Sequence, residues 1–153
     1  QKEKAEAKQR RMKMLNTARL YELAQFLEDL PEERFDMARW FGPDNDHFNW
    51  ITAQIAELAV STNHEPHRLD CGTAACIAGW TVFLWPEDIC ANFSVAYNAR
   101  HILGLNAREA IVFTAFDQIH TTKHAANALR SIADGTLPHF IGAHNEGGNE
   151  EDQ

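Results

Sequence analysis

The spacing of apolar residues along the chain predicts a helical protein. From residue 16 onward, apolar positions recur at intervals of three and four residues, and capping or helix-stopping residues separate one run from the next. Alternation with a period of two, which a half-buried strand would show, is absent. We therefore expect an all-α fold, built as a compact single domain of six or seven short helices.

Capping residues and helix breakers set the expected boundaries. Asn16 or Thr17 can cap the first helix and Pro31 stops it, whereas Gly104 ends a later one. Thr121 or Thr122 can cap the last long helix, which Gly135 ends. The expected helices cover residues 17–30, 31–41, 47–59 (capped by one of Asp44, Asn45 and Asp46), 73–84, 95–103, 107–116 (capped by Asn106) and 122–134.

Charge divides the chain into an arm, a body and a tail. Residues 1–19 hold seven basic and two acidic residues, a net charge of +5. Because the whole chain has a net charge of −8, the remaining residues carry −13. We expect residues 1–15 to form a basic helical extension, residues 16–141 the globular domain, and residues 142–153 an acidic flexible tail. Such an arm favours contact with nucleic acid, with another subunit or with its own body; the alternative is a solvated extension without a partner.

Length and composition narrow the classes of protein. A chain of 153 residues suffices for one domain with a buried core. No apolar run reaches the roughly 18 residues of a membrane-spanning helix, and the polar N-terminus has no secretory signal. Three cysteines are too few, and odd in number, for a disulfide scaffold, which favours a reducing compartment. We expect no membrane contact and a location in the cytoplasm of a bacterial cell or a phage-infected host.

The stretch HEPHRLDCGTAAC, residues 64–76, holds the main candidates for metal chemistry. His64, His67, Cys71 and Cys76 supply imidazole and thiolate, the ligands that zinc prefers, and four of them could close a tetrahedral structural site. Zinc is thus the cofactor to test. In the competing interpretation no cofactor is bound, Cys76 is a small core residue, and the two histidines lie in a loop.

Cys71 is also a candidate nucleophile. It precedes the predicted helix 73–84, whose dipole and free N–H groups would favour a thiolate. The local Asp-Cys-small-small text resembles the nucleophile helix of papain-like and cell-wall-hydrolase cysteine enzymes. Those enzymes need a histidine at the thiol, and no recognisable partner motif surrounds the available ones. The available histidines are His101, His120, His124 and His139.

The interpretation of this stretch as the start of a buried helix accounts for more of its residues. Asp70 or Thr73 could cap a helix over residues 73–84. On that helix, one face carries only apolar and small residues. These residues are Cys76, Gly79, Trp80, Phe83 and Leu84.

Three segments occur in a recognisable order: FDMARW at 35–40, CGTAACIAGW at 71–80 and LGLNAREAIVF at 103–113. Together they resemble a group of small uncharacterised bacterial and phage proteins with F-x-M-x-x-W, C-G-T-x-x-C-x-x-G and Leu-Gly-Leu elements. The resemblance spans about residues 20–133. It brings no established activity and hence no catalytic residue, and it implies that residues 1–15 lie outside the shared core. Position 80 is often histidine in that group, so Trp80 weakens the case for a metal here.

The segment RHILGLNAREAIVF, residues 100–113, resembles a helix-turn-helix. A DNA-reading helix needs exposed basic or amide side chains, and the second helix offers only Arg108. A packed αα-hairpin is the alternative. Nucleic acid would then be reached only through the basic arm, because the rest of the chain is acidic.

The sequence therefore predicts a non-enzymatic protein that binds another macromolecule, including a second copy of itself. The resemblance suggests a phage or mobile-element accessory factor that modulates a host protein. A cysteine hydrolase, a structural zinc protein and a helix-turn-helix DNA binder are the alternatives. The candidate partner-binding residues are Lys8, Arg10, Arg11 and Lys13 in the arm, with Trp40 and Phe41 as an exposed anchor.

Overall fold

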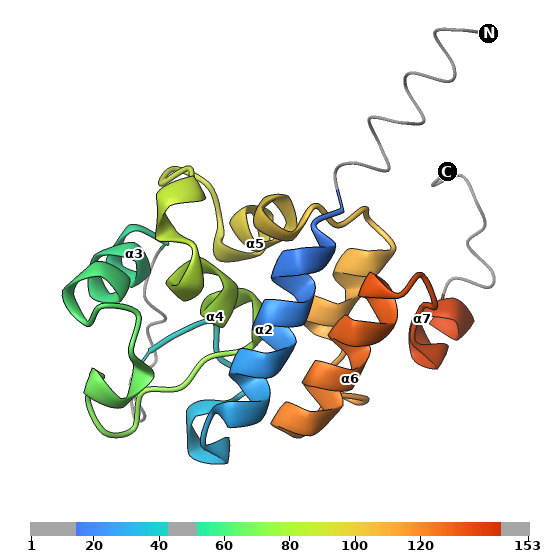
Figure 1. Cartoon of the computed structure of the whole chain (residues 1–153), viewed down its shortest axis with the longest axis horizontal. Helices are drawn as coiled ribbons and strands as arrows, with labels where there is room; N and C mark the ends of the chain where they lie inside the picture. The colour runs from blue at the N-terminus through green and yellow to red at the C-terminus, as the bar shows by residue number, and fades with distance from the viewer. Residues whose placement is uncertain (1–14, 43–51, 145–153) are drawn as a thin grey trace, which may run out of the picture.

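The fold was obtained as a computed structural model, which describes residues 15–42 and 52–144 (Figure 1). Within these ranges the chain forms six α-helices, four short 3₁₀ turns and no β-strand, so the predicted all-α single domain is confirmed. No helix of the described part is long and apolar enough to cross a membrane. The predictions for the arm residues Lys8, Arg10, Arg11 and Lys13, and for the acidic tail from residue 145, lie outside the described residues.

Helices α2 (Thr17–Asp29) and α6 (Thr122–Ala133) lie side by side along one half of the molecule (Figure 1). Both begin at predicted caps: the Asn16 side chain accepts a hydrogen bond from the Arg19 amide, and the Thr121 hydroxyl accepts one from the His124 amide, each at 3.0 Å. Each helix turns a stripe of alanine and leucine toward the other.

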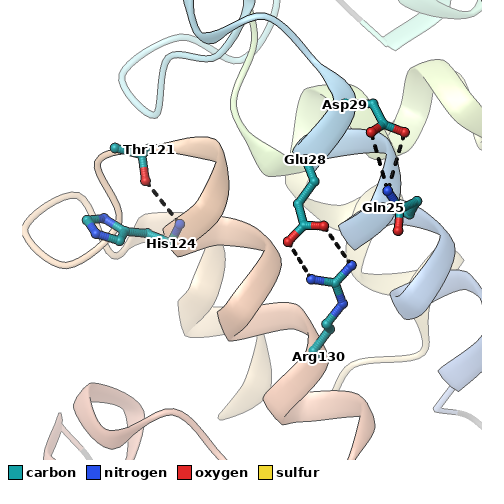
Figure 2. A network of polar contacts seen from close by, with 6 residues as sticks. All are labelled: Gln25, Glu28, Asp29, Thr121, His124 and Arg130. Carbon is teal, nitrogen blue, oxygen red and sulfur yellow. Dashed lines mark hydrogen bonds and ion pairs between the residues drawn. The ribbon is translucent and has the colours of Figure 1, made fainter.

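Polar contacts at one end join the same two helices. Glu28 accepts two hydrogen bonds from the guanidinium of Arg130, at 2.7 and 3.1 Å (Figure 2). The Glu32 carboxylate, just beyond α2, accepts from both the amide and the hydroxyl of Thr122, the latter at 2.6 Å. Glu32 therefore satisfies one of the free amides at the start of α6.

Helix α4 (Ile77–Leu84) is the centre of the other half, between α3 (Thr52–Ser61) and α5 (Val95–Leu103). All of its residues except Leu84 are buried, which is the pattern of a helix surrounded by protein. The rings of Phe41, Trp80 and Phe83 meet one another there at centroid distances of 5.1 to 5.8 Å. Cys76 precedes this helix and is buried, as the structural interpretation expects.

The predicted helix over residues 31–41 is wrong. Only the 3₁₀ turn η1 (Glu32–Arg34) forms, and the following segment makes bridges of the β type with residues 74 and 75. The same pairing delays the start of α4 to Ile77, so the prediction that Asp70 or Thr73 caps it is also wrong. In both places, long-range main-chain pairing replaces the helix that local propensity favours.

Other boundaries differ less from the predictions. Helix α5 ends at Gly104 in the left-handed conformation (φ 71°), as predicted. The helix predicted over residues 107–116 is the 3₁₀ turn η4 (Glu109–Thr114), which begins with reciprocal 2.8 Å bonds between Asn106 and Glu109. A further helix, α7 (His139–His144), was not predicted, and it crosses the expected domain end at residue 141. The capping position predicted at residues 44–46 lies outside the described residues.

Candidate functional site

The first two motif segments pack against each other and form one structural unit. Five main-chain hydrogen bonds join residues 34–42 to residues 74–76, and we call this unit the motif clamp. The bonds run from Ala75 N to Arg34 O, Asp36 N to Ala75 O, Ala74 N to Gly42 O, Gly42 N to Ala74 O and Cys76 N to Arg39 O, at 2.8 to 3.1 Å.

Two arginines of the clamp hold the loop that contains Cys71. The Arg34 guanidinium donates to three backbone carbonyls of residues 69, 70 and 73, at 2.8 to 3.0 Å. The Arg39 guanidinium donates to the carbonyls of Gly42 and Gly72 and lies 3.4 Å from Asp36. These side chains satisfy carbonyls of a loop without regular structure, so their role in this geometry is to shape the backbone.

The clamp also explains the Gly79-Trp80 pair. A Cβ on Gly79 would meet the carbonyl oxygen of Trp40 at 1.7 Å, so only glycine lets the two segments approach this closely. The indole N–H of Trp80 donates to the carbonyl of Arg34 at 3.0 Å, which pairs the one polar atom of a fully buried ring. These residues of the two motifs therefore act in folding.

The predicted zinc ligands do not converge. His64, His67 and Cys71 are exposed and Cys76 is buried. Burial raises the pKa of the Cys76 thiol to about 11, so this sulfur stays protonated at neutral pH. In the described ranges, no three side chains of His, Cys, Asp or Glu are grouped closely enough to hold a metal ion.

Cys71 lies in a turn, six residues ahead of the first residue of α4. The sulfur of Cys71 is therefore not at a helix N-terminus, which was the physical reason to expect a reactive thiolate. No hydrogen bond among the described residues joins Cys71 to a histidine. His101 stacks on Tyr97, and His124 accepts a hydrogen bond from the His120 amide.

Two other predicted sites also change. Phe41 is fully buried and Trp40 is half-buried, so the pair cannot act as the exposed anchor that we expected.

The segment after Asn106 is a 3₁₀ turn of six residues, and Arg108 precedes it. A helix-turn-helix reader needs an α-helix at that place, so the structure lacks the predicted recognition helix.

An open, mostly apolar groove of about 530 Å³ lies between α3 and the 3₁₀ turn η3 (Pro86–Asp88). Val60 contributes its most exposed apolar side chain, with 68% of its surface accessible. Glu57 and Glu87 are exposed carboxylates, and the described residues of the wall include neither Lys nor Arg. We call it the α3–η3 groove. It is lined by Ala56, Glu57, Val60, Ser61, His64, Pro86 and Glu87.

The end of α3 is held in an uncommon backbone conformation. Asn63 and His64 have φ values of 57° and 62°, a left-handed region that side chains other than glycine occupy at a cost. The His64 amide closes the helix by donating to the carbonyl of Ala59 at 2.8 Å. This turn brings His64 into the groove wall, with its ring 6.5 Å from that of Phe83. The predicted ligand His64 thus belongs to a surface groove.

The opposite wall is fixed to the body by Arg19 of α2. Its guanidinium pairs with Asp88 at 2.5 Å, donates to the carbonyl of Ile102 at 3.1 Å, and lies 5.1 Å from the ring centre of Trp85. The turn η3 is therefore joined to both α2 and α5, and the groove has two supported walls.

A second exposed surface lies on α5. The rings of Phe93, Tyr97 and His101 follow one another at centroid distances of 4.4 Å, and a hollow of about 360 Å³ lies beside them at Arg100 and Leu105. We call this the α5 ring stack.

No protein-family model, curated protein or solved structure matched the chain. Sequence reasoning missed the groove because each wall residue looks ordinary alone. The available signal was Val60, a β-branched apolar residue that lies off the stripe of Ile55, Leu58 and Ala59 on the same helix.

Proposed function

We propose that this protein is a protein-binding module, and that its α3–η3 groove holds a basic, partly apolar segment of another protein. The observation that carries the proposal is Val60, a large apolar side chain that is 68% exposed in the wall of a hollow. Valine at an exposed helical position adds nothing to folding and slightly disfavours the helix. Its burial by a partner would recover the hydrophobic contribution that folding leaves unused.

The charge of the rim selects the chemistry of the partner. Glu57 and Glu87 flank the apolar floor, and no Lys or Arg is among the lining residues that the structure describes. A partner segment with Lys or Arg around apolar residues would complement both features, whereas an acidic segment would be repelled. The negative charge of the chain beyond residue 19 would raise the rate of encounter with such a segment.

The groove is suited to binding because its walls are fixed before a partner arrives. Arg19 holds η3 through Asp88, and the left-handed turn at Asn63 and His64 sets the end of α3. A preformed site loses less conformational entropy on binding than a mobile one.

Site-specific photo-crosslinking tests the proposal. A photoreactive amino acid replaces Val60 in one variant and Phe116 in a control, because Phe116 is another exposed apolar residue, 52% accessible and outside the groove. Both variants are expressed in the cells from which the sequence comes, and mass spectrometry maps the crosslinked peptides.

We expect position 60 to trap one protein through a segment rich in Lys or Arg, and position 116 not to trap it. Equal trapping from both positions, or a crosslinked segment that is acidic, would contradict the proposal. The wider idea of a phage or mobile-element factor that modulates a host protein depends on the resemblance of the motifs, and the identity of the trapped protein tests it.

A further inference from the structure

We infer that the basic segment of this chain itself, residues 1–14, occupies the α3–η3 groove in the same molecule when no partner is bound. This inference rests on the proposed function, because it names the competitor that a partner must displace. Residues 1–14 lie outside the described residues, so their sequence, the residue at which the described chain begins and the lining of the groove carry the inference.

The charges of the segment and the groove are complementary. Residues 1–14 contain six basic and two acidic residues, a net charge of +4. The groove presents Glu57 and Glu87, and its described wall contains neither Lys nor Arg. Met12 and Met14 add flexible apolar side chains, which adapt to irregular apolar surfaces. The segment therefore has the chemistry that the groove requires of a partner.

The described chain begins at the end of α5, and the first turn of α2 reaches the η3 wall. The amide of Asn16 donates to the carbonyl of Leu103 at 2.9 Å, so the first residues lie at the end of α5. One turn later, Arg19 pairs with Asp88, the neighbour of the groove residue Glu87. The first turn of α2, which follows residues 1–14 in the chain, thus contacts the η3 wall.

The length of the segment is sufficient. Fourteen residues span about 21 Å as a helix and about 45 Å when extended. Attachment in the same molecule gives a high effective concentration, so weak contacts suffice for substantial occupancy. A partner would then bind with an affinity reduced by the fraction of molecules in which the segment fills the groove.

The α5 ring stack does not suit this segment as well. Arg100 lies in the hollow there, and its positive charge would oppose a basic segment. Docking of residues 1–14 at Tyr97 and His101 is therefore an outcome that would count against the inference.

Paramagnetic relaxation measurements on the full-length chain test the inference. Cys71 and Cys90 are replaced by Ser, and Gln9→Cys then provides the labelling site, since the remaining Cys76 is fully buried. A nitroxide at position 9 is expected to broaden the amide signals of Val60, His64 and Glu87. The broadening should decline in the Glu57→Lys/Glu87→Lys variant and in about 0.5 M salt, which screens the attraction.

Three results would overturn the inference. The groove signals are not broadened at all, the broadening is centred on Tyr97 and His101, or it persists at similar strength in a mixture of spin-labelled, unenriched chain with unlabelled, isotope-enriched chain. The last result would place the segment of a second copy in the groove.

A second measurement separates this inference from the proposed function. The protein trapped at position 60 is titrated against the wild type and against a variant with Lys8, Arg10, Arg11 and Lys13 all changed to Glu. We expect the variant to bind about threefold or more tightly, because the internal competitor is gone. If the groove binds the partner but the nitroxide broadens no groove signal, only the inference fails. If the broadening is found and no partner binds, only the proposed function fails.

Discussion

The carbonyl oxygen of Trp40 occupies the space where a side chain on Gly79 would begin. An ideal Cβ at Gly79 would lie 1.7 Å from that oxygen and 2.9 Å from the Cβ of Ala75. The first motif supplies the backbone carbonyl of this contact and the second supplies the residue without a side chain, which explains why position 79 is glycine.

Gly79→Ala should therefore destabilise the fold severely. Alanine favours a helix by about 1 kcal/mol over glycine, but the clash is with backbone and cannot be relieved by a rotamer change. We expect a net loss of about 3 kcal/mol in the free energy of unfolding, measured by urea denaturation. Gly135→Ala is the control: a Cβ there meets nothing within 4 Å, and only its φ of 85° opposes the change, at about 1 kcal/mol. Equal stability of the two variants would refute the contact.

The stability of the protein should decline at alkaline pH because of Cys76. Burial raises the pKa of this thiol from 9.0 to about 11. Below pH 9 the thiol is protonated in both the folded and the unfolded state and adds no pH dependence. Between pH 9 and 11 only the unfolded state loses the proton, so the free energy of unfolding falls by about 1.4 kcal/mol per pH unit.

Denaturation with urea at several pH values measures this slope, and Cys76→Ala should reduce it. Cys71→Ala provides the matched control, since it removes an exposed thiol and keeps the buried Cys76, so the slope that Cys76 causes should remain. If Cys76→Ala keeps the full slope, the thiol is not the group that titrates.

The Glu28–Arg130 pair should contribute at neutral pH and not in acid (Figure 2). The hydrogen bond from Arg130 lowers the pKa of the Glu28 carboxyl below its ordinary value of 4.5, with a smaller contribution from Lys123. The stability that this pair contributes is fully present at pH values above 4.5, the ordinary pKa of the carboxyl. It is lost as the pH falls through the lower pKa of Glu28 in the folded state. Carboxyl titration by NMR should show a higher Glu28 pKa in Arg130→Gln, and a smaller rise in Lys123→Gln. A larger rise in Lys123→Gln would contradict the assignment.

His64→Gly should separate stability from binding. Glycine relieves the left-handed conformation, so the free energy of unfolding should rise by up to about 1 kcal/mol. The same change removes a side chain from the groove wall and should weaken the complex with the protein trapped at position 60. Asn63→Gly is the control, because Asn63 shares the conformation but not the groove. Weakening of binding by both variants would point to the turn rather than to the imidazole.

Local signals in the sequence predicted the helix ends well. The capping residues bond to groups within one helical turn, so the local sequence is enough to predict them. These residues are Asn16, Gly104 and Thr121. The segment 31–41 failed for the opposite reason. Its residues favour a helix, but Arg34 and Gly42 pair with main chain more than 30 positions away, which no local pattern contains.

The candidate site was harder to predict than the fold. Cys71 and His67 are chemically suggestive residue types, yet the structure leaves them exposed and apart from any ligand cluster in its described part. Val60 and Pro86 look unremarkable, and they become a surface only when α3 and η3 are placed together. Of the predicted site residues that the structure describes, His64 alone lines the groove, and it was chosen for metal binding.

The affinity of the purified protein trapped at position 60 tests the central claim most directly. Isothermal titration would compare the wild type with Val60→Asn, which places a neutral polar group on the apolar floor, and with the control Phe116→Ser outside the groove. We predict at least about tenfold weaker binding for Val60→Asn, equivalent to about 1.4 kcal/mol, and an unchanged Kd for Phe116→Ser. An unchanged Kd for Val60→Asn in a folded protein would contradict the proposed function.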